Sequence, residues 1–151
     1  MKSEFVKYLQ QDSVLMLEGE TKKDVLEEII SYATTRCTLD DIQLRELIWK
    51  REKMMTTGIG NGLALPHIRV AGFPAPLVIV GRCNNPIPDS DYHTLDKGPV
   101  RLIVFLAADE KDQDAYLKIL GSISVKLKDK ALMDEILAAP DKAAIFEILN
   151  R

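Results

Sequence analysis

An α/β fold, in which helices cover both faces of one mixed β-sheet, is predicted by three features of the sequence. Two apolar runs, residues 77–81 and 101–107, are typical of strands that are buried on both faces. Stretches with apolar residues at helical spacing precede and follow these runs. Strands that alternate with helices favour one sheet between two helical layers. With 151 residues, the chain is long enough for one domain with a substantial core.

The first elements are predicted from apolar spacing and a helix start signal. Residues 4–9 carry three apolar side chains on one helical face, which predicts a short helix, and residues 14–17 predict a short strand. Thr21 and Asp24 have the form of a capping box, with Asp in place of Glu. The apolar stripe behind this box predicts a helix that ends near residue 33.

A second helix is predicted from Thr38 to about Lys50, because two aspartates after Thr38 favour the positive end of a helix. Arg51 then falls at the C-terminal end of this helix, where the helix dipole alone already favours a cation. The residues expected to be buried are Ile42, Leu47 and Ile48.

The C-terminal half predicts a loop and three helices around the second strand. Residues 84–99 are polar and contain three prolines, so we expect a loop in which His93 is exposed. Helices are predicted over residues 112–128, 131–138 and 141–149. The side chains expected on one face of the long helix are Leu117, Leu120, Ser124 and Leu127, with Tyr116 and Ile123 on the flanks.

Charge, cysteine content and the N-terminal residues argue against several classes of protein. The formal net charge is −3 and no basic block occurs, so the sequence gives no support for nucleic-acid binding. Cys37 and Cys83 form neither a disulfide framework nor a Cys-x-x-Cys motif, which favours a reduced, cytoplasmic protein. The N-terminus has no long apolar run, so neither a signal peptide nor membrane insertion is expected.

One stretch, residues 51–67, concentrates the unusual residues of the chain. Glycines stand at positions 58, 60 and 62, and Pro66 directly precedes His67, which is one of two histidines. Glycine permits positive φ and a close approach of the backbone to another group. Pro66 fixes its own φ and favours an extended conformation at Leu65. This arrangement presents the imidazole of His67 at a defined angle.

The chemistry of these residue types indicates a phosphohistidine site rather than a metal site. A neutral imidazole is a good nucleophile near neutral pH, because the ordinary pKa of histidine is about 6.5. The backbone N–H groups of a glycine-rich loop suit a phosphate. Arg51 and Arg69 flank the stretch and carry the charge that neutralises phosphoryl oxygens.

Three other sites fit the stretch less well. Leu63 stands where a dinucleotide-binding fingerprint needs its third glycine, and the spacing differs from that of a Walker A loop. A zinc site needs three or four ligands, and the cysteines are distant in sequence. The spacing alone leaves two interpretations open: a phosphohistidine site, or a structural His67 at the end of a glycine-rich turn.

The same stretch resembles the signature of the enzyme IIA components of the bacterial phosphoenolpyruvate-dependent phosphotransferase system, fructose/mannitol type. This type includes the nitrogen-regulatory IIA proteins. The resemblance extends over the whole chain and implies that residues 1–151 form a phosphotransferase system IIA type-2 domain with the mannitol-type IIA fold. The matching residues are Arg51, Glu52, Thr56, Thr57, Gly58, Ile59, Gly60, Gly62, Ala64, Pro66 and His67.

The resemblance implies a phosphotransferase with a phosphohistidine intermediate. His67 would accept a phosphoryl group from a histidine-containing phosphocarrier protein, and Arg51 would stabilise it. No cofactor or metal is implied, because the phosphoryl group arrives already activated. The partner that receives the phosphoryl group would be a IIB component, or the phosphorylated chain would act on a regulatory target protein. The residues implied as a phosphate-binding loop are Thr57, Gly58, Gly60 and Gly62.

One residue departs from the family's usual pattern. Fructose/mannitol-type IIA domains often carry a second histidine on the helix after the last long strand, and Tyr116 stands there in this sequence. Tyrosine can donate a hydrogen bond but supplies no imidazolium charge. This difference favours a regulatory protein of the nitrogen-regulatory type. A sugar-specific IIA for uptake and a non-phosphorylated binding paralogue are the alternative functions. The alternative for Tyr116 itself is a purely structural role in the core.

Overall fold

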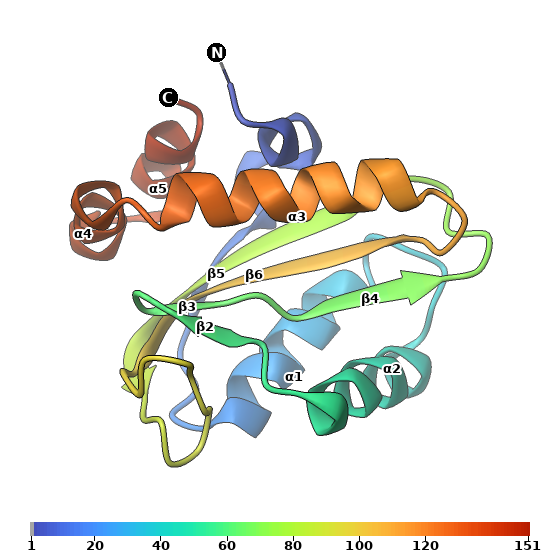
Figure 1. Cartoon of the computed structure of the whole chain (residues 1–151), viewed down its shortest axis with the longest axis horizontal. Helices are drawn as coiled ribbons and strands as arrows, with labels where there is room; N and C mark the ends of the chain where they lie inside the picture. The colour runs from blue at the N-terminus through green and yellow to red at the C-terminus, as the bar shows by residue number, and fades with distance from the viewer. Residues whose placement is uncertain (1) are drawn as a thin grey trace.

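Six strands form one mixed sheet, and helices cover both of its faces (Figure 1). The computed structural model describes residues 2–151. The strands are β1 (Val14–Leu17), β2 (Gly58–Gly60), β3 (Leu63–Ala64), β4 (His67–Val70), β5 (Leu77–Ile87) and β6 (Val100–Asp109). The helices are η1 (Glu4–Tyr8), η2 (Gln11–Ser13), α1 (Lys22–Ala33), α2 (Asp41–Met54), α3 (Gln113–Leu127), α4 (Lys130–Ala138) and α5 (Lys142–Leu149).

The long strand β6 is the centre of the sheet. The strand order is β1-β5-β6-β3-β2, and β4 also pairs with β6, on the side of β3. β5 pairs with β6 in an antiparallel manner, whereas β3 and β4 run parallel to it. This register places His67 opposite Leu106 and Leu63 opposite Leu102. The single mixed sheet with helices on both faces, which the sequence predicts, is confirmed.

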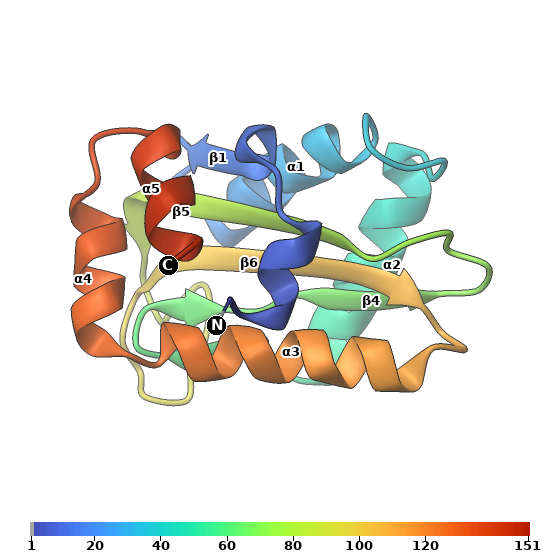
Figure 2. The ribbon, with the colours of Figure 1, turned by 90° about the horizontal axis from the view of Figure 1, so that it is seen from above.

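The sheet separates two apolar cores. Figure 1 shows α1 and α2 below the sheet and α3 above it, and Figure 2 shows η1, α4 and α5 on the side of α3. Along β6, Leu102, Val104 and Leu106 join the core under α3, whereas Ile103 and Phe105 join the core over α1 and α2. Because neighbouring side chains of a strand point to opposite faces, a continuous apolar run supplies both cores.

The second helix starts later and ends later than the sequence indicates. Asp40, not Thr38, is the N-cap: its carboxylate accepts from the N–H of Gln43, and the Gln43 side chain closes the capping box. α2 continues to Met54, so Arg51 lies inside its last turn. The prediction that Ile42 is buried was wrong, since its exposed fraction is 60%.

Two further expectations are corrected in the C-terminal half. β5 extends to Ile87, through residues assigned to a loop, because Ile87 pairs with Val100 beyond a register shift. The long helix was predicted correctly, but its buried face differs: Leu117 is exposed. The buried residues of α3 are Tyr116, Ile119, Ile123 and Leu127.

Gly81 in β5 allows β1 to pack closely, and its replacement is expected to destabilise the fold. A Cβ at Gly81 would lie 2.5 Å from Leu17 Cδ1 and 2.9 Å from Leu17 Cγ, and Leu17 is fully buried. We expect Gly81→Ala to lower the free energy of unfolding by about 1–3 kcal/mol, the usual effect of overpacking. Gly121→Ala is the control, because its Cβ would meet nothing within 4 Å and alanine favours a helix. Urea denaturation of both variants tests this, and equal midpoints would contradict it.

Candidate functional site

His67 stands at the start of β4 with its ring held in one tautomer. Its Nδ1 lies 2.7 Å from the carbonyl oxygen of Leu65, and its Nε2 lies 3.3 Å from Nε of Arg51. A carbonyl only accepts and a guanidinium only donates. The proton is therefore on Nδ1, and the lone pair of Nε2 faces the Arg51 side chain. Pro66 lies between Leu65 and His67 and fixes the short backbone path that brings the Leu65 carbonyl to Nδ1.

The surroundings keep the His67 ring neutral. Burial lowers the pKa of His67 below its usual 6.5, and the charge of Arg51 acts in the same direction. The hydrogen bond to Leu65 and the charge of Glu52 oppose these effects without reversing the net shift. A neutral ring with an unprotonated nitrogen is the nucleophilic form of histidine.

This shift predicts how the nucleophile responds to acid. Protonation of Nε2 removes the lone pair, so the rate of phosphorylation is lost as pH falls through the pKa of His67. We expect the rate to stay constant as pH decreases through 6.5 and to decline only below it. Phosphorylation rates with phosphoramidate from about pH 5 to about pH 8 measure this midpoint. A midpoint at or above the ordinary histidine value would contradict the prediction.

Arg51 connects the histidine to the end of α2. Its Nη1 donates to the carbonyl oxygen of Met55 at 2.8 Å while its Nε faces His67. The guanidinium thus satisfies a carbonyl at the C-terminus of its own helix, where a cation is favoured. Within residues 2–151 the remaining N–H groups of the fork make no hydrogen bond, so they can bind an oxyanion.

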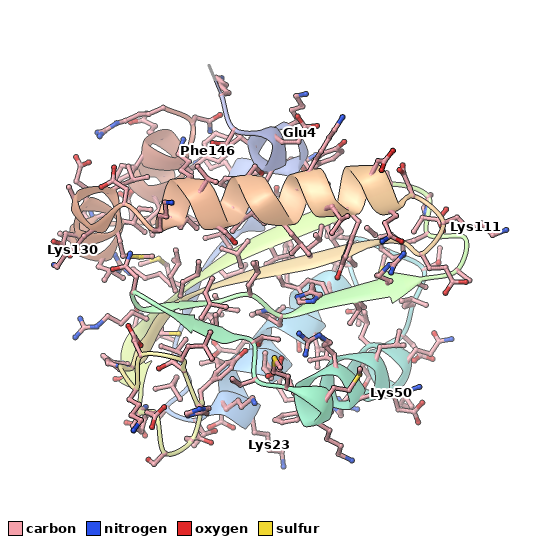
Figure 3. All side chains as sticks on the ribbon, in the orientation of Figure 1. Glu4, Lys23, Lys50, Lys111, Lys130 and Phe146 are labelled. Atoms are coloured by element: carbon pink, nitrogen blue, oxygen red, sulfur yellow. The ribbon has the colours of Figure 1, made fainter. Side chains whose placement is uncertain are left out.

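A cavity of about 340 Å³ lies beside His67, which forms part of its lining. Three of its side chains are cationic, namely Lys50, Arg51 and Arg69, and no acidic side chain within residues 2–151 lines it. Figure 3 shows side-chain nitrogens gathered between β4 and α2, on the side of the molecule where Lys50 is labelled. Such a cavity favours an anion of high charge density. Its lining residues are Leu47, Lys50, Arg51, Met54, His67, Ile68, Arg69 and Tyr116.

Tyr116 and Arg69 form the wall opposite Arg51. The ring centroids of Tyr116 and His67 are 5.9 Å apart, and the Arg69 guanidinium carbon lies 5.0 Å from the Tyr116 ring centroid. Arg69 is itself held by the carbonyl oxygen of Glu110 at 2.7 Å. Tyr116 is therefore both a core residue, with 7% of its surface exposed, and part of the cavity wall.

The structure does not bring the whole glycine-rich loop to the histidine. Gly60, the last residue of β2, and Gly62, in the turn between β2 and β3, both have positive φ. This turn lies near Leu102 of β6, whereas His67 lies opposite Leu106, about 13 Å further along the strand at about 3.3 Å per residue. The N–H of Asn61 in the turn donates to Asp96, so it is already occupied.

Thr57 and Gly58 lie at the other end of the hairpin, closer to the site. The carbonyl oxygen of Thr57 accepts from the N–H of Leu65, the residue that holds His67 Nδ1. A side chain at Gly58 would overlap the backbone of His93 and the side chain of Thr94. These two positions therefore set the backbone path that carries His67.

A buried polar network beneath the site was not found by sequence reasoning. Glu52 Oε2 accepts from the Thr57 hydroxyl at 2.7 Å, and this hydroxyl lies 2.6 Å from that of Tyr92. Glu52 Oε1 lies 2.9 Å from Lys22 Nζ, an ion pair without hydrogen-bond geometry. The Lys22 ammonium also lies 4.4 Å from the Tyr92 ring centroid. The network fixes Glu52, the neighbour of Arg51, to the start of β2.

Other residues singled out by the sequence lie outside this site. The His93 side chain is 59% exposed, as predicted, and its Nδ1 lies 2.8 Å from Asp89 Oδ1. Cys37 and Cys83 are free thiols. Within the described residues, no group of three or more His, Cys, Asp or Glu side chains is arranged to hold a metal ion. The helices of residues 2–151 include none that is long and apolar enough to span a membrane.

Known proteins are similar to this chain in sequence and in fold. The chain is 31% identical over 138 residues to the PTS system fructose-specific EIIABC component of Bacillus subtilis, but spans only 21% of that protein. It is 32% identical over 138 residues to a nitrogen regulatory protein of Pseudomonas aeruginosa, covering 91% of this chain and 88% of that protein. The crystal structure of nitrogen regulatory protein IIA-Ntr from Neisseria meningitidis matches with a TM-score of 0.88 at 26% identity, over 98% of this chain and 100% of that one.

A family model also describes most of the sequence. The model named phosphoenolpyruvate-dependent sugar phosphotransferase system, EIIA 2, matches residues 7–151. The match includes every residue of the cavity and of the buried polar network. The chain therefore belongs to the EIIA 2 family of the phosphoenolpyruvate-dependent sugar phosphotransferase system.

Proposed function

We propose that this chain accepts a phosphoryl group on Nε2 of His67 from a histidine-containing phosphocarrier protein. The single observation that carries the proposal is the fixed tautomer: Nδ1 is bound to the Leu65 carbonyl, and the lone pair of Nε2 faces a cationic cavity. A structural histidine would need no such cavity. The family description, which names a phosphoenolpyruvate-dependent phosphotransferase system, supports the same chemistry. A cytoplasmic location is part of this proposal.

The transfer follows from the positions of the two ring nitrogens. The Nε2 lone pair attacks the phosphorus, while the phosphorus–nitrogen bond of the donor breaks and its electron pair returns to the donor imidazole. The proton stays on Nδ1, which donates it to the Leu65 carbonyl oxygen, and this hydrogen bond stabilises the positive charge on the phosphorylated ring. Arg51 then donates to the phosphoryl oxygens instead of to Nε2, in the role of an oxyanion-stabilising fork.

The glycines have a supporting part in this proposal. Thr57 and Gly58 hold the backbone that presents His67, and Gly60 and Gly62 shape the hairpin turn. The phosphoryl group would be bound by side chains of the cavity rather than by the N–H groups of this turn. We include residues 1–151 in a single functional domain.

We favour a regulatory role, in which the phosphorylation state of His67 controls binding to a target protein. The chain covers 88% of a relative named a nitrogen regulatory protein at 32% identity, and it resembles IIA-Ntr in structure. A phosphoryl group adds about −1.5 to −2 charges to a cavity lined by three cations, which changes the surface offered to a partner. Delivery to a IIB component is the alternative, supported by the relative that is named an EIIABC component.

The proposal is tested with phosphoenolpyruvate, enzyme I and the histidine-containing phosphocarrier, followed by phosphorus NMR. The wild type should give a phosphohistidine signal that His67→Ala lacks, whereas His93→Ala, the other histidine, should retain it. Addition of a IIB component then distinguishes the two roles, because only a carrier should lose its phosphoryl group to IIB. Absence of the signal in the wild type, or its persistence in His67→Ala, would contradict the proposal.

A further inference from the structure

The hydroxyl of Tyr116 is a polar group without a partner in the described part of the chain. It makes no hydrogen bond within residues 2–151, although the residue is 7% exposed and its ring packs in the core under α3. Within residues 2–151, Glu52 Oε1 is the only buried side-chain oxygen or nitrogen without a hydrogen-bond partner, so the Tyr116 hydroxyl is open to solvent rather than enclosed. Since the residue lines the cavity beside His67, the hydroxyl is reachable for a group that enters this cavity.

The side chains around Tyr116 hold it in place rather than occupy its hydroxyl. Arg69 from β4 stacks on the ring at 5.0 Å, and its Nη2 donates to the Glu110 carbonyl at 2.7 Å and faces Gln113 Oε1 at 3.3 Å. The His67 ring lies at 5.9 Å with an interplanar angle of 60°. The ring of Tyr116 thus packs against both Arg69 and His67, and its orientation is set before any ligand arrives.

We propose that Tyr116 donates a hydrogen bond from its hydroxyl to a phosphoryl oxygen on His67 Nε2, with Arg69 as the residue that positions it. The proposal rests on the proposed function, because it assigns the second side of the same phosphoryl site. Arg51 binds the phosphoryl group from α2, and Tyr116 binds it from α3. Two donors on opposite sides orient the group for in-line transfer.

The electrostatic surroundings keep this hydroxyl protonated. Burial raises the pKa of Tyr116, while the charges of Arg69 and Arg51 act in the opposite direction and only reduce the rise. The charged and titratable groups that face Tyr116 across the cavity are Lys50 and Arg51 of α2 and His67 and Arg69 of β4. A neutral phenol donates at every physiological pH, whereas an imidazolium in its place would lose its positive charge and one of its two N–H donors near neutral pH.

The test uses phosphoramidate, a small donor with a phosphorus–nitrogen bond, so that no partner protein is needed. Phosphorus NMR follows the formation of phosphohistidine in the wild type, Tyr116→Phe, Tyr116→His and the control Tyr8→Phe. We expect Tyr116→Phe to slow phosphorylation by at least about tenfold, because a hydrogen bond to a charged group is lost. Tyr8→Phe also removes one phenol hydroxyl but lies on η1, outside the cavity, and should react like the wild type. Thermal unfolding confirms that all variants are folded.

The pH profile separates a donor from a core residue. Tyr116→His should phosphorylate faster than Tyr116→Phe at low pH and lose this advantage as the new imidazolium deprotonates, whereas the wild type should show no such second transition. Equal rates for Tyr116→Phe and the wild type, with His67→Ala inert, would overturn this inference and leave the proposed function intact. A wild type that forms no phosphohistidine would overturn both.

Discussion

Arg51→Met is expected to slow phosphoryl transfer to His67 by about 10²- to 10³-fold, the usual cost of removing one donor to a developing oxyanion. Methionine keeps an unbranched aliphatic stem but has no side-chain N–H group. The substitution removes the Nε contact at 3.3 Å that faces the attacking nitrogen, and the fork that replaces it on the phosphoryl oxygens. Rapid-quench measurements with a phosphorylated carrier protein give the rate.

Two comparisons show whether the fork or only the charge of Arg51 matters. Lys50→Met removes a cation from the same cavity, and no hydrogen bond joins Lys50 to His67. We therefore expect a much smaller decrease in rate for Lys50→Met. Arg51→Lys keeps the charge but not the planar fork, so its rate should lie between those of wild type and Arg51→Met. Equal effects of Lys50→Met and Arg51→Met would show that the cavity acts only through its summed charge.

The contact between Arg51 and His67 could be anticipated from the sequence, since both belong to one short stretch with a distinctive pattern. The buried strands could be predicted for a different reason: burial on both faces requires apolar residues at every position. The end of β5 could not, because Asn84, Asn85 and Pro86 have the composition of a loop. Their strand conformation depends on pairing of Ile87 with Val100, which only the folded chain provides.

The buried face of α3 shows how local patterns can mislead. The predicted face and the observed face both follow the spacing of three and four residues, and both contain Leu127. A shift of one residue rotates a helix face by about 100°. The choice between Leu117 and Tyr116 is made by the sheet and by the cavity, where Tyr116 meets Arg69 and His67. No property of the helix alone determines this choice.

The network around Glu52 could not be predicted because its members are far apart in the chain. Thr57 and Tyr92 are separated by 35 residues, and Lys22 reaches Glu52 from the first turn of α1. Nothing in the sequence around any of these residues indicates that its polar group is buried. Their shared burial follows from the packing of α1 against α2, with Thr57 and Tyr92 brought in by loops before β2 and after β5.

Glu52→Ala is expected to lower the free energy of unfolding by about 3–5 kcal/mol, the typical effect of breaking a buried ion pair. The Glu52 side chain is 2% exposed and that of Lys22 is 14% exposed, so the substitution leaves an ammonium without its counter-charge in a largely dry site. The Thr57 hydroxyl also loses its acceptor. Urea denaturation followed by circular dichroism measures the loss.

A double variant distinguishes the network from the simple loss of side-chain volume. Lys22→Met with Glu52→Met removes both charges and keeps the packing, so it should recover much of the stability lost in Glu52→Ala. Asp134→Ala, which breaks an exposed pair with Lys130, should leave stability unchanged. If the double variant were as unstable as Glu52→Ala, the hydrogen bond to Thr57 rather than the ion pair would hold the end of α2. Arg51 would then depend on the Thr57 hydroxyl for its position, and Thr57→Val should slow phosphorylation of His67 without a change in the His67 tautomer.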